Sequence, residues 1–187
     1  MNIIAAAVAA ITVLGVVVEF VTHPKSRQQL GIPRGDWLSV LLILVPYASA
    51  GLLNLACWLR PPVKPDWALA ACGFLLCLGC LFFRTWGKLV LGDYYTFSID
   101  LRSDDHPVID YGPYRLVRHP LYFGVLLGIL GMPLLAHSWL ALLIFSFPIG
   151  FVYGLRLLKE DRFLMDNMGE PYRIYARRTA RLIPFVW

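Results

Sequence analysis

The chain has 187 residues, of which 58% are hydrophobic and only 16% charged, and its formal net charge is +5. A soluble domain is about half apolar and about a quarter charged, so this composition excludes an ordinary soluble domain and indicates an integral membrane protein. The positive charge does not favour nucleic-acid binding, because the basic residues flank apolar runs, where such residues set membrane topology and contact lipid headgroups.

The first 91 residues contain three apolar runs that approach or exceed the roughly 20 residues needed to span a bilayer. No basic leader region precedes the first run, so we expect a retained helix and not a signal peptide. Glu19, near the end of that run, is expected at the membrane interface, with a buried polar role as the less favoured alternative. The expected spans are Ile3–Val21, Trp37–Trp58 and Trp67–Phe83, the last with a possible extension to Leu91.

The cysteines all lie within these apolar runs. Cys77 and Cys80 have a spacing typical of redox or metal sites, but no second pair or nearby histidine completes a ligand set. We therefore predict no metal site and interpret these residues as small packing residues of membrane helices.

A long polar stretch and two further apolar runs make up the second half. Gly92–Arg118 carries charges of both signs and many aromatic and branched residues, a composition that argues against disorder and for a functional loop. Spans are expected at Leu121–Ala136 and Trp139–Leu155, and the two-residue link between them forces an antiparallel helical hairpin. A basic, aromatic tail, Arg156–Trp187, follows.

The lysines and arginines are distributed unequally across this arrangement. With about five spans, the central loop and the tail lie on the side that holds most of the basic residues, which is expected to be cytoplasmic. The sequence therefore predicts a single all-α integral membrane domain over residues 1–187, with three spans in 1–91 and the polar loop, hairpin and tail in 92–187.

Polar groups converge at the start of the fourth span. Pro120 suits the first turn of a helix, which places His119 at its N-cap, beside backbone N–H groups that favour anions. The hairpin brings this point close to Arg156 and Glu160. Each residue also has a simpler interpretation: His119 as a helix cap, and Arg156 with Glu160 as a surface i,i+4 pair. Because these polar residues come from two neighbouring spans and meet at one point, we favour a functional site over the simpler interpretations.

The stretch Gly112–Gly124 reads GPYRLVRHPLYFG and resembles the signature of the isoprenylcysteine carboxyl methyltransferase family. The second half of that signature follows in order and spacing within Arg156–Pro184, as RxxxED, GxxYxxY and LIP. The resemblance covers about Leu91 to the end, whereas the first three spans match only in type. It implies a membrane-embedded enzyme that uses S-adenosylmethionine to methylate the carboxylate of a prenylated cysteine, with residues 92–187 as the cofactor-binding catalytic half.

The resemblance also implies site residues, carried over by position. Arg156 matches the position that the family assigns to the substrate side of the site, and it is the implied catalytic residue. Two positions depart from the family pattern: Asp161 replaces a second glutamate, and Ile99 stands where some members place a polar cofactor contact. The implied cofactor contacts are His106, Pro107, Val108, Ile109, Tyr114, His119, Pro120, Leu121, Tyr122 and Glu160.

The residue types suit this chemistry in their own right. A carboxylate such as Glu160 and aromatic faces such as Tyr122 favour a sulfonium cation. The guanidinium of Arg156 can hold an acceptor carboxylate with two parallel hydrogen bonds, and a carboxylate nucleophile needs no general base. Since no GxGxxG motif follows a strand, a Rossmann-type methyltransferase is excluded.

Several functions remain open at this stage. The family's relatives methylate phospholipid amines or small thiols, and the acceptor-binding spans are too generic here to choose among these and a prenylated acid. A nicotinamide-dependent sterol or lipid reductase of related architecture is a second class, since its cofactor phosphate could use the basic residues Arg115, Arg118, Arg177 and Arg178. A non-catalytic membrane protein is the third. The expected partners are a lipophilic or prenylated substrate and membrane lipids, with no nucleic acid.

Overall fold

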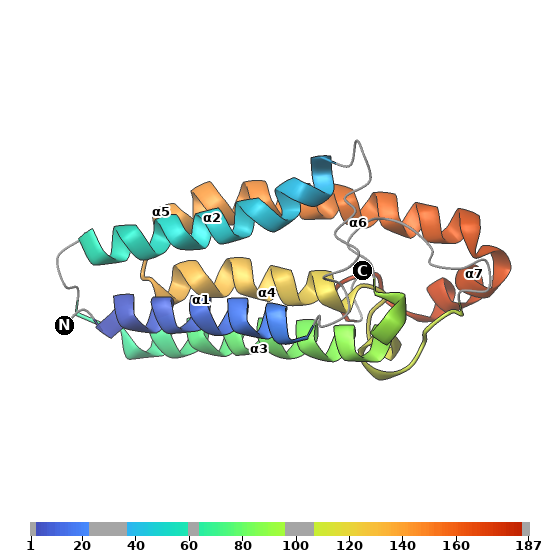
Figure 1. The fold of residues 1–187 in the computed structure, drawn as a ribbon, viewed down its shortest axis with the longest axis horizontal. Helices are drawn as coiled ribbons and strands as arrows, with labels where there is room; N and C mark the ends of the chain where they lie inside the picture. The colour runs from blue at the N-terminus through green and yellow to red at the C-terminus, as the bar shows by residue number, and fades with distance from the viewer. Residues whose placement is uncertain (1–2, 23–36, 60–63, 96–106, 185–187) are drawn as a thin grey trace.

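The computed structural model describes residues 3–22, 37–59, 64–95 and 107–184, and within these ranges the chain is helical and forms no β-strand (Figure 1). This confirms the predicted all-α class. Each predicted span contains a helix. The α-helices are α1 (Ile3–Val21), α2 (Trp37–Leu59), α3 (Trp67–Leu91), α4 (Pro120–Leu135), α5 (Trp139–Ala141), α6 (Phe147–Asn167) and α7 (Gly169–Arg178).

The helices in the third and fifth predicted spans extend beyond Phe83 and Leu155, the residues at which those spans were predicted to end. Helix α3 continues to Leu91, and α5, a π-helical turn at Leu142–Ser146 and α6 form one continuous helical segment that ends at Asn167. The sequence predicts this continuation of the fifth span, because the tail has helical character up to about Met168 and then a break at Gly169 and Pro171. By length and hydropathy, the described helical segments Trp67–Tyr94 and Trp139–Asn167 qualify as membrane spans, whereas the apolar parts of α1, α2 and α4 are shorter. The extension of α6 matters because it carries the polar site residues.

Local signals fix the starts of α3 and α4, which lie at opposite ends of the bundle. The side chain of Asp66 caps α3 by accepting hydrogen bonds from the backbone N–H groups of Ala68 and Leu69. Pro120 occupies the first turn of α4, where its missing N–H costs nothing, and His119 is the N-cap residue, as predicted. The His119 side chain makes no capping hydrogen bond, which leaves its ring available for another partner.

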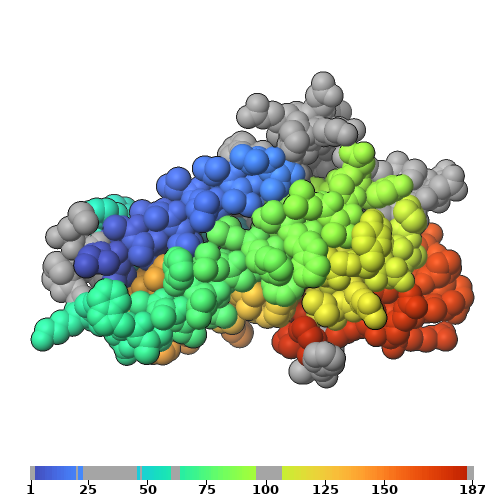
Figure 2. All heavy atoms as spheres, turned by 90° about the horizontal axis from the view of Figure 1, so that it is seen from below, coloured from blue at the N-terminus to red at the C-terminus, as the bar shows by residue number. Residues whose placement is uncertain are grey.

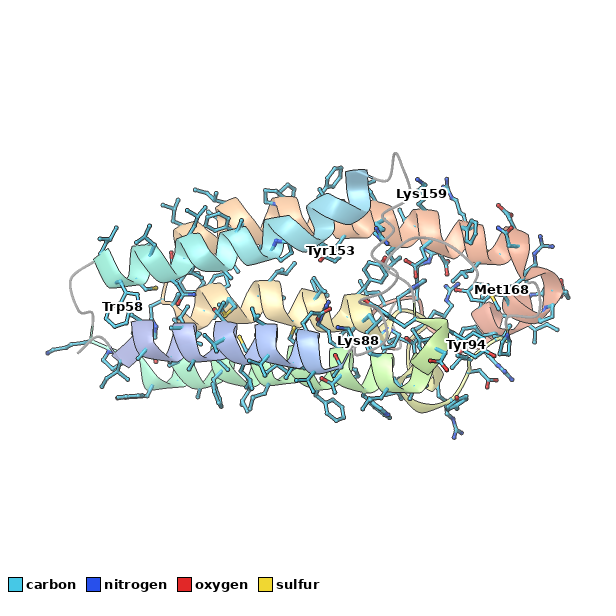
Figure 3. All side chains as sticks on the ribbon, in the orientation of Figure 1. Trp58, Lys88, Tyr94, Tyr153, Lys159 and Met168 are labelled. Carbon is cyan, nitrogen blue, oxygen red and sulfur yellow. The ribbon has the colours of Figure 1, made fainter. Side chains whose placement is uncertain are left out.

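The long helices lie side by side along the long axis of the molecule, with Trp58 near one end and Met168 near the other (Figures 1 and 3). Helix α4 runs antiparallel to both α3 and α6. Gly169, with φ +64°, lets the chain turn from α6 into α7, which lies at the same end as the start of α4. The polar segments 107–119 and 169–184 thus lie at one end of the bundle, where Figure 2 shows them in yellow and red.

A seam of small residues holds α3 against α4. A Cβ atom on Gly73 would lie 2.3 Å from the backbone N of Leu135 and 2.8 Å from the carbonyl O of Gly131, so only glycine permits this approach. Gly124 and Gly128 continue the seam, against Arg84 and Cys80. Small residues let membrane helices pack backbone to backbone, and here they set the position of α4 relative to α3.

Buried apolar side chains concentrate at the end of the bundle opposite the polar segments. Many apolar side chains elsewhere point outward, including Leu75, Phe82 and Phe147, as expected for surfaces that contact lipid. The buried cluster comprises Ile4, Ala5, Val8, Leu53, Cys57, Leu135, Ala136 and Ala141.

The seam generates a stability prediction. Gly73→Ala should destabilise the protein by about 1–3 kcal/mol, because the added methyl group meets backbone atoms that cannot rotate away. Gly51→Ala on α2 is the matched control, since a Cβ there meets nothing within 4 Å. Thermal unfolding in detergent measures both variants. Equal melting temperatures for the two would contradict the close α3–α4 contact.

Candidate active site

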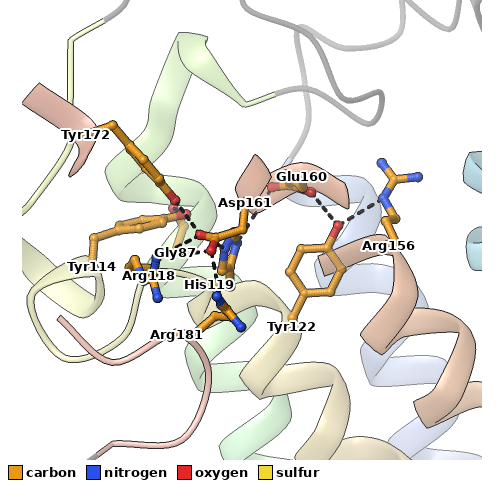
Figure 4. Close-up of polar contacts among 10 residues, drawn as sticks. All are labelled: Gly87, Tyr114, Arg118, His119, Tyr122, Arg156, Glu160, Asp161, Tyr172 and Arg181. Carbon is orange, nitrogen blue, oxygen red and sulfur yellow. Dashed lines mark hydrogen bonds and ion pairs between the residues drawn. The ribbon is translucent and has the colours of Figure 1, made fainter. Parts of the chain in front are cut away.

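Asp161 on α6 lies at the centre of a buried polar cluster (Figure 4). Both carboxylate oxygens accept hydrogen bonds from Nη1 of Arg118 at 3.0 Å. Tyr172 Oη donates to Oδ1 at 2.9 Å, Arg181 Nε donates to Oδ2 at 3.0 Å, and His119 Nε2 lies 3.1 Å from Oδ1. Only 2% of Asp161 is exposed, so this carboxylate depends on these partners for its solvation.

This Asp161 cluster ties three parts of the chain together: the segment before α4, helix α6, and α7 with the chain that follows it. Backbone hydrogen bonds run alongside, from Arg118 N to the carbonyl O of Ala180 and from His119 N to that of Arg181. Burial raises the pKa of Tyr172, and the charge of Asp161 raises it further, so the phenol stays protonated and donates. The cluster thereby holds these three parts of the chain in fixed positions beside one another.

Three predicted cofactor contacts lie in or next to the segment before α4 that this cluster holds in place. They are Tyr114, His119 and Pro120. His119 is buried against Asp161, and its Nδ1 lies 3.8 Å from Glu160 Oε1. Tyr114 is buried, which raises the pKa of its phenol, and its Oη donates to the carbonyl O of Gly87 at 3.4 Å. None of the three lines the cavity described next, and their contact with a cofactor stays a prediction.

A cavity of about 330 Å³ lies between α1, α2, α3, α4 and the α5–α6 segment. Most of its wall is apolar, and one end carries a group of three polar side chains, Tyr122, Arg156 and Glu160. Arg156 Nε donates to Tyr122 Oη at 2.9 Å, and Tyr122 Oη donates to Glu160 Oε2 at 2.5 Å (Figure 4). Tyr122 therefore bridges the two α6 residues, a link that i,i+4 spacing alone did not predict.

Asp161 and Glu160 are adjacent in sequence but serve different surroundings. Successive residues of an α-helix point about 100° apart, so Glu160 reaches the cavity while Asp161 turns toward Arg118 and Tyr172 (Figure 4). In the sequence, Asp161 stands out only as a departure from the family pattern, and its central role was not predicted. A signal was available, since a single acid following Glu160 would be expected to partner the nearby arginines and tyrosines.

A second charged group faces the same cavity from α1 and α3. Glu19 accepts from Arg84 Nη2 at 2.8 Å and pairs with Lys88 Nζ at 2.5 Å, and all three side chains line the cavity. The structure favours the alternative prediction, a buried polar role for Glu19, because its carboxylate pairs with two cations at the cavity. The physical reason is that two cations on a membrane helix need a nearby anion, and α1 supplies it.

The sequence model of the isoprenylcysteine carboxyl methyltransferase (ICMT) family matches residues 71–166. The chain belongs to this family. Protein-S-isoprenylcysteine O-methyltransferase A of Arabidopsis thaliana is 29% identical over 155 residues, which is 80% of this chain and 79% of the plant protein. The Schizosaccharomyces pombe protein-S-isoprenylcysteine O-methyltransferase is 29% identical over 118 residues, 63% of this chain and 49% of the yeast protein.

The ICMT fold is also found by structural comparison. The solved structure of a eukaryotic intramembrane Ras methyltransferase, ICMT, superposes with a TM-score of 0.64 at 18% identity, over 96% of this chain. The chain spans 64% of the length of that structure. The predicted resemblance is thus confirmed, and family membership makes the protein a membrane methyltransferase.

The structure separates the predicted site residues into groups. Leu121, Tyr122, Arg156 and Glu160 line the cavity. Pro107, Val108 and Ile109 lie just before the 3₁₀ turn at Gly112–Arg115 and do not line it. His106 and Ile99 lie outside the described residues.

Removal of the charge at Asp161 tests whether the Asp161 cluster holds α6, α7 and the segment before α4 together. Asp161→Asn should destabilise the protein by about 3–5 kcal/mol, since loss of one partner leaves Arg118 buried without its counter-charge. It should also expose α7 and the following residues to limited proteolysis. Asp166→Asn, an exposed acid on the same helix, is the control and should behave as wild type. A wild-type melting temperature and digestion pattern for Asp161→Asn would contradict this role.

Proposed function

We propose that the protein transfers a methyl group from S-adenosylmethionine to the carboxylate of an isoprenylcysteine-like lipid. The observation that carries the proposal is a largely apolar cavity that ends at the hydrogen-bonded group of Tyr122, Arg156 and Glu160. The wall suits an isoprenoid chain, and the polar end suits a charged head. Relatives of this chain are named isoprenylcysteine O-methyltransferases, which agrees with this choice of acceptor.

The residues at the polar end suit S-adenosylmethionine, which supplies a methyl group activated by a sulfonium cation when bound. Glu160 offers a carboxylate to the cationic parts of the molecule. Tyr122 and Tyr153 present aromatic rings with centroids 5.9 Å apart, and both line the cavity. Aromatic faces attract cations, so both features favour this donor over a neutral one.

Arg156 is the residue we assign to the acceptor carboxylate. It is buried, with 6% of its surface exposed, and a guanidinium at such a site binds a carboxylate with well-defined geometry. Its Nε is held by Tyr122, which fixes the orientation of the planar group. A carboxylate acceptor is already ionised at neutral pH and needs no residue to remove a proton. The contribution of the protein is therefore alignment and exclusion of water by the apolar wall.

We further propose that the five long helical segments cross the membrane and that the site opens to the cytoplasm. Arginines gather at the end of the bundle that carries the Asp161 cluster, among them Arg118, Arg177, Arg178 and Arg181. Cytoplasmic ends of membrane helices carry an excess of such residues, which supports this orientation.

Cofactor binding provides the direct test of the methyl donor. Calorimetric titration in detergent should show that S-adenosylhomocysteine binds and that a reduced nicotinamide cofactor does not. Glu160→Gln should weaken binding about ten- to a hundredfold, because hydrogen bonds to a charged group contribute about 1.5–3 kcal/mol. Glu170→Gln, an exposed acid on α7, is the matched control. Binding of the nicotinamide cofactor alone would favour a reductase, and normal binding by Glu160→Gln would contradict its assigned role.

Arg156→Lys tests the class of acceptor. Lysine keeps the charge but loses the planar fork, so methylation of a carboxylate acceptor should fall at least tenfold in kcat/KM while cofactor affinity changes by less than about threefold. Amine and thiol acceptors should be affected much less. Arg162→Lys, on the exposed side of α6, is the control. Parallel loss of cofactor binding and of activity with every acceptor would show that Arg156 only supports Tyr122 and Glu160.

A further inference from the structure

The cavity ends at an apolar floor, opposite the polar end that carries Arg156. Four of its described lining residues either belong to the buried apolar cluster or pack against it: Ile11, Leu53, Met132 and Phe145. One helical turn farther along α1 and α2, Val8 and Cys57 are 0% and 1% exposed, and neither lines the cavity. The described helices therefore leave no space for a ligand beyond these four residues, which we call the floor.

An irregular part of its helix holds Phe145 at the floor. Phe145 lies in the π-helical turn Leu142–Ser146, and such turns are rare and occur frequently at functional sites. The next residue, Ser146, donates its hydroxyl to the carbonyl O of Ile129 on α4. That carbonyl needs a donor because Pro133, four residues later in α4, has no N–H to offer it. A hydrogen bond between the two helices thus fixes the height of Phe145 relative to α4.

The distance from the floor to Arg156 suits a prenyl chain of one length. Phe145 precedes Arg156 by eleven residues in one helical segment, which corresponds to about 16 Å along the helix. An extended chain advances about 1.2 Å per bond, so an S-prenylcysteine with a 10-, 15- or 20-carbon prenyl group measures about 13, 18 or 23 Å from its carboxylate carbon to its last carbon. A carboxylate held at Arg156 therefore brings a 15-carbon chain to the floor, whereas a 20-carbon chain is about 7 Å too long.

We propose that the floor limits the prenyl chain of the acceptor to 15 carbons and that Phe145 is the residue that sets this limit. The inference rests on the proposed function only in that the cavity takes the prenyl chain of the acceptor. A longer chain must either leave its last isoprene unit outside the cavity or draw its carboxylate away from Arg156, and both reduce binding. Phe145 thereby determines specificity at the end of the cavity remote from methyl transfer.

The test compares three ligands that share one headgroup and differ in chain length: the geranyl, farnesyl and geranylgeranyl forms of N-acetyl-S-prenylcysteine. Their binding to the full-length protein is measured in detergent without a methyl donor. Phe145→Ala opens the floor, so it should lower the ratio of the geranylgeranyl to the farnesyl dissociation constant at least tenfold relative to wild type. Partition of each ligand into detergent is the same for every variant and cancels in this comparison.

Ala50→Leu changes the space in the opposite direction. Ala50 lines the cavity on α2, about one helical turn nearer the polar end than Leu53, so a larger side chain there shortens the space above the floor. This variant should raise the ratio of the farnesyl to the geranyl dissociation constant at least tenfold. Phe147→Ala is the matched control, because Phe147 lies two residues from Phe145 but is 76% exposed. Both ratios should stay within twofold of wild type in this control.

The outcomes are distinguishable. A ratio within twofold of wild type in either folded variant, or an equal shift in Phe147→Ala, would overturn the length limit and indicate that the chain leaves the cavity between the helices. Should Phe145→Ala fail to fold, Phe145→Leu and Ala50→Leu carry the test with the same expected directions.

Methylation of the three ligands is measured separately, so that this inference and the proposed function can fail independently. If the ratios shift as expected but wild type methylates none of the ligands, the proposed function is wrong and the length limit stands. Methylation with unchanged ratios has the reverse meaning. Failure of all three ligands to bind wild type would overturn both.

Discussion

The buried carboxylate of Asp161 is the constraint on which the site depends. Its negative charge cannot remain in an apolar surrounding without partners, and Arg118, His119, Tyr172 and Arg181 provide them. These partners come from segments far apart in the chain, so satisfying one charge brings those segments together. Residues that look like separate motif positions are, in the folded protein, parts of one polar cluster.

Glu160 and the cavity gain their position from this cluster. Because Asp161 anchors its face of α6, the next face presents Glu160 and Arg156 to Tyr122 on α4. The position of α4 against α3 is set independently, by the close contact between Gly73 and the α4 backbone. Rigid helix packing on one side and ion pairing on the other thus hold the polar end of the cavity, an arrangement suited to alignment of two substrates.

The two buried charged groups described above follow one rule. A cation away from water is stable only beside an anion, and each group supplies one: Glu19, on the cavity wall, for Arg84 and Lys88, and Asp161, away from the cavity, for Arg118 and Arg181. The same rule gives the cavity its chemical character. The ion pair that links α1 to α3 also faces the space between the helices.

The sequence by itself determined the helices, their order, the hairpin and the family, because apolar length, helix-start residues and motif spacing are local properties of the chain. Those predictions include the N-cap position of His119 and the helical hairpin of the last two spans. Only the tertiary structure decided which polar residues meet. The inward direction of Glu19, the bridge through Tyr122 and the central place of Asp161 depend on distances between helices, which the glycine seam and buried charges fix and no single segment encodes.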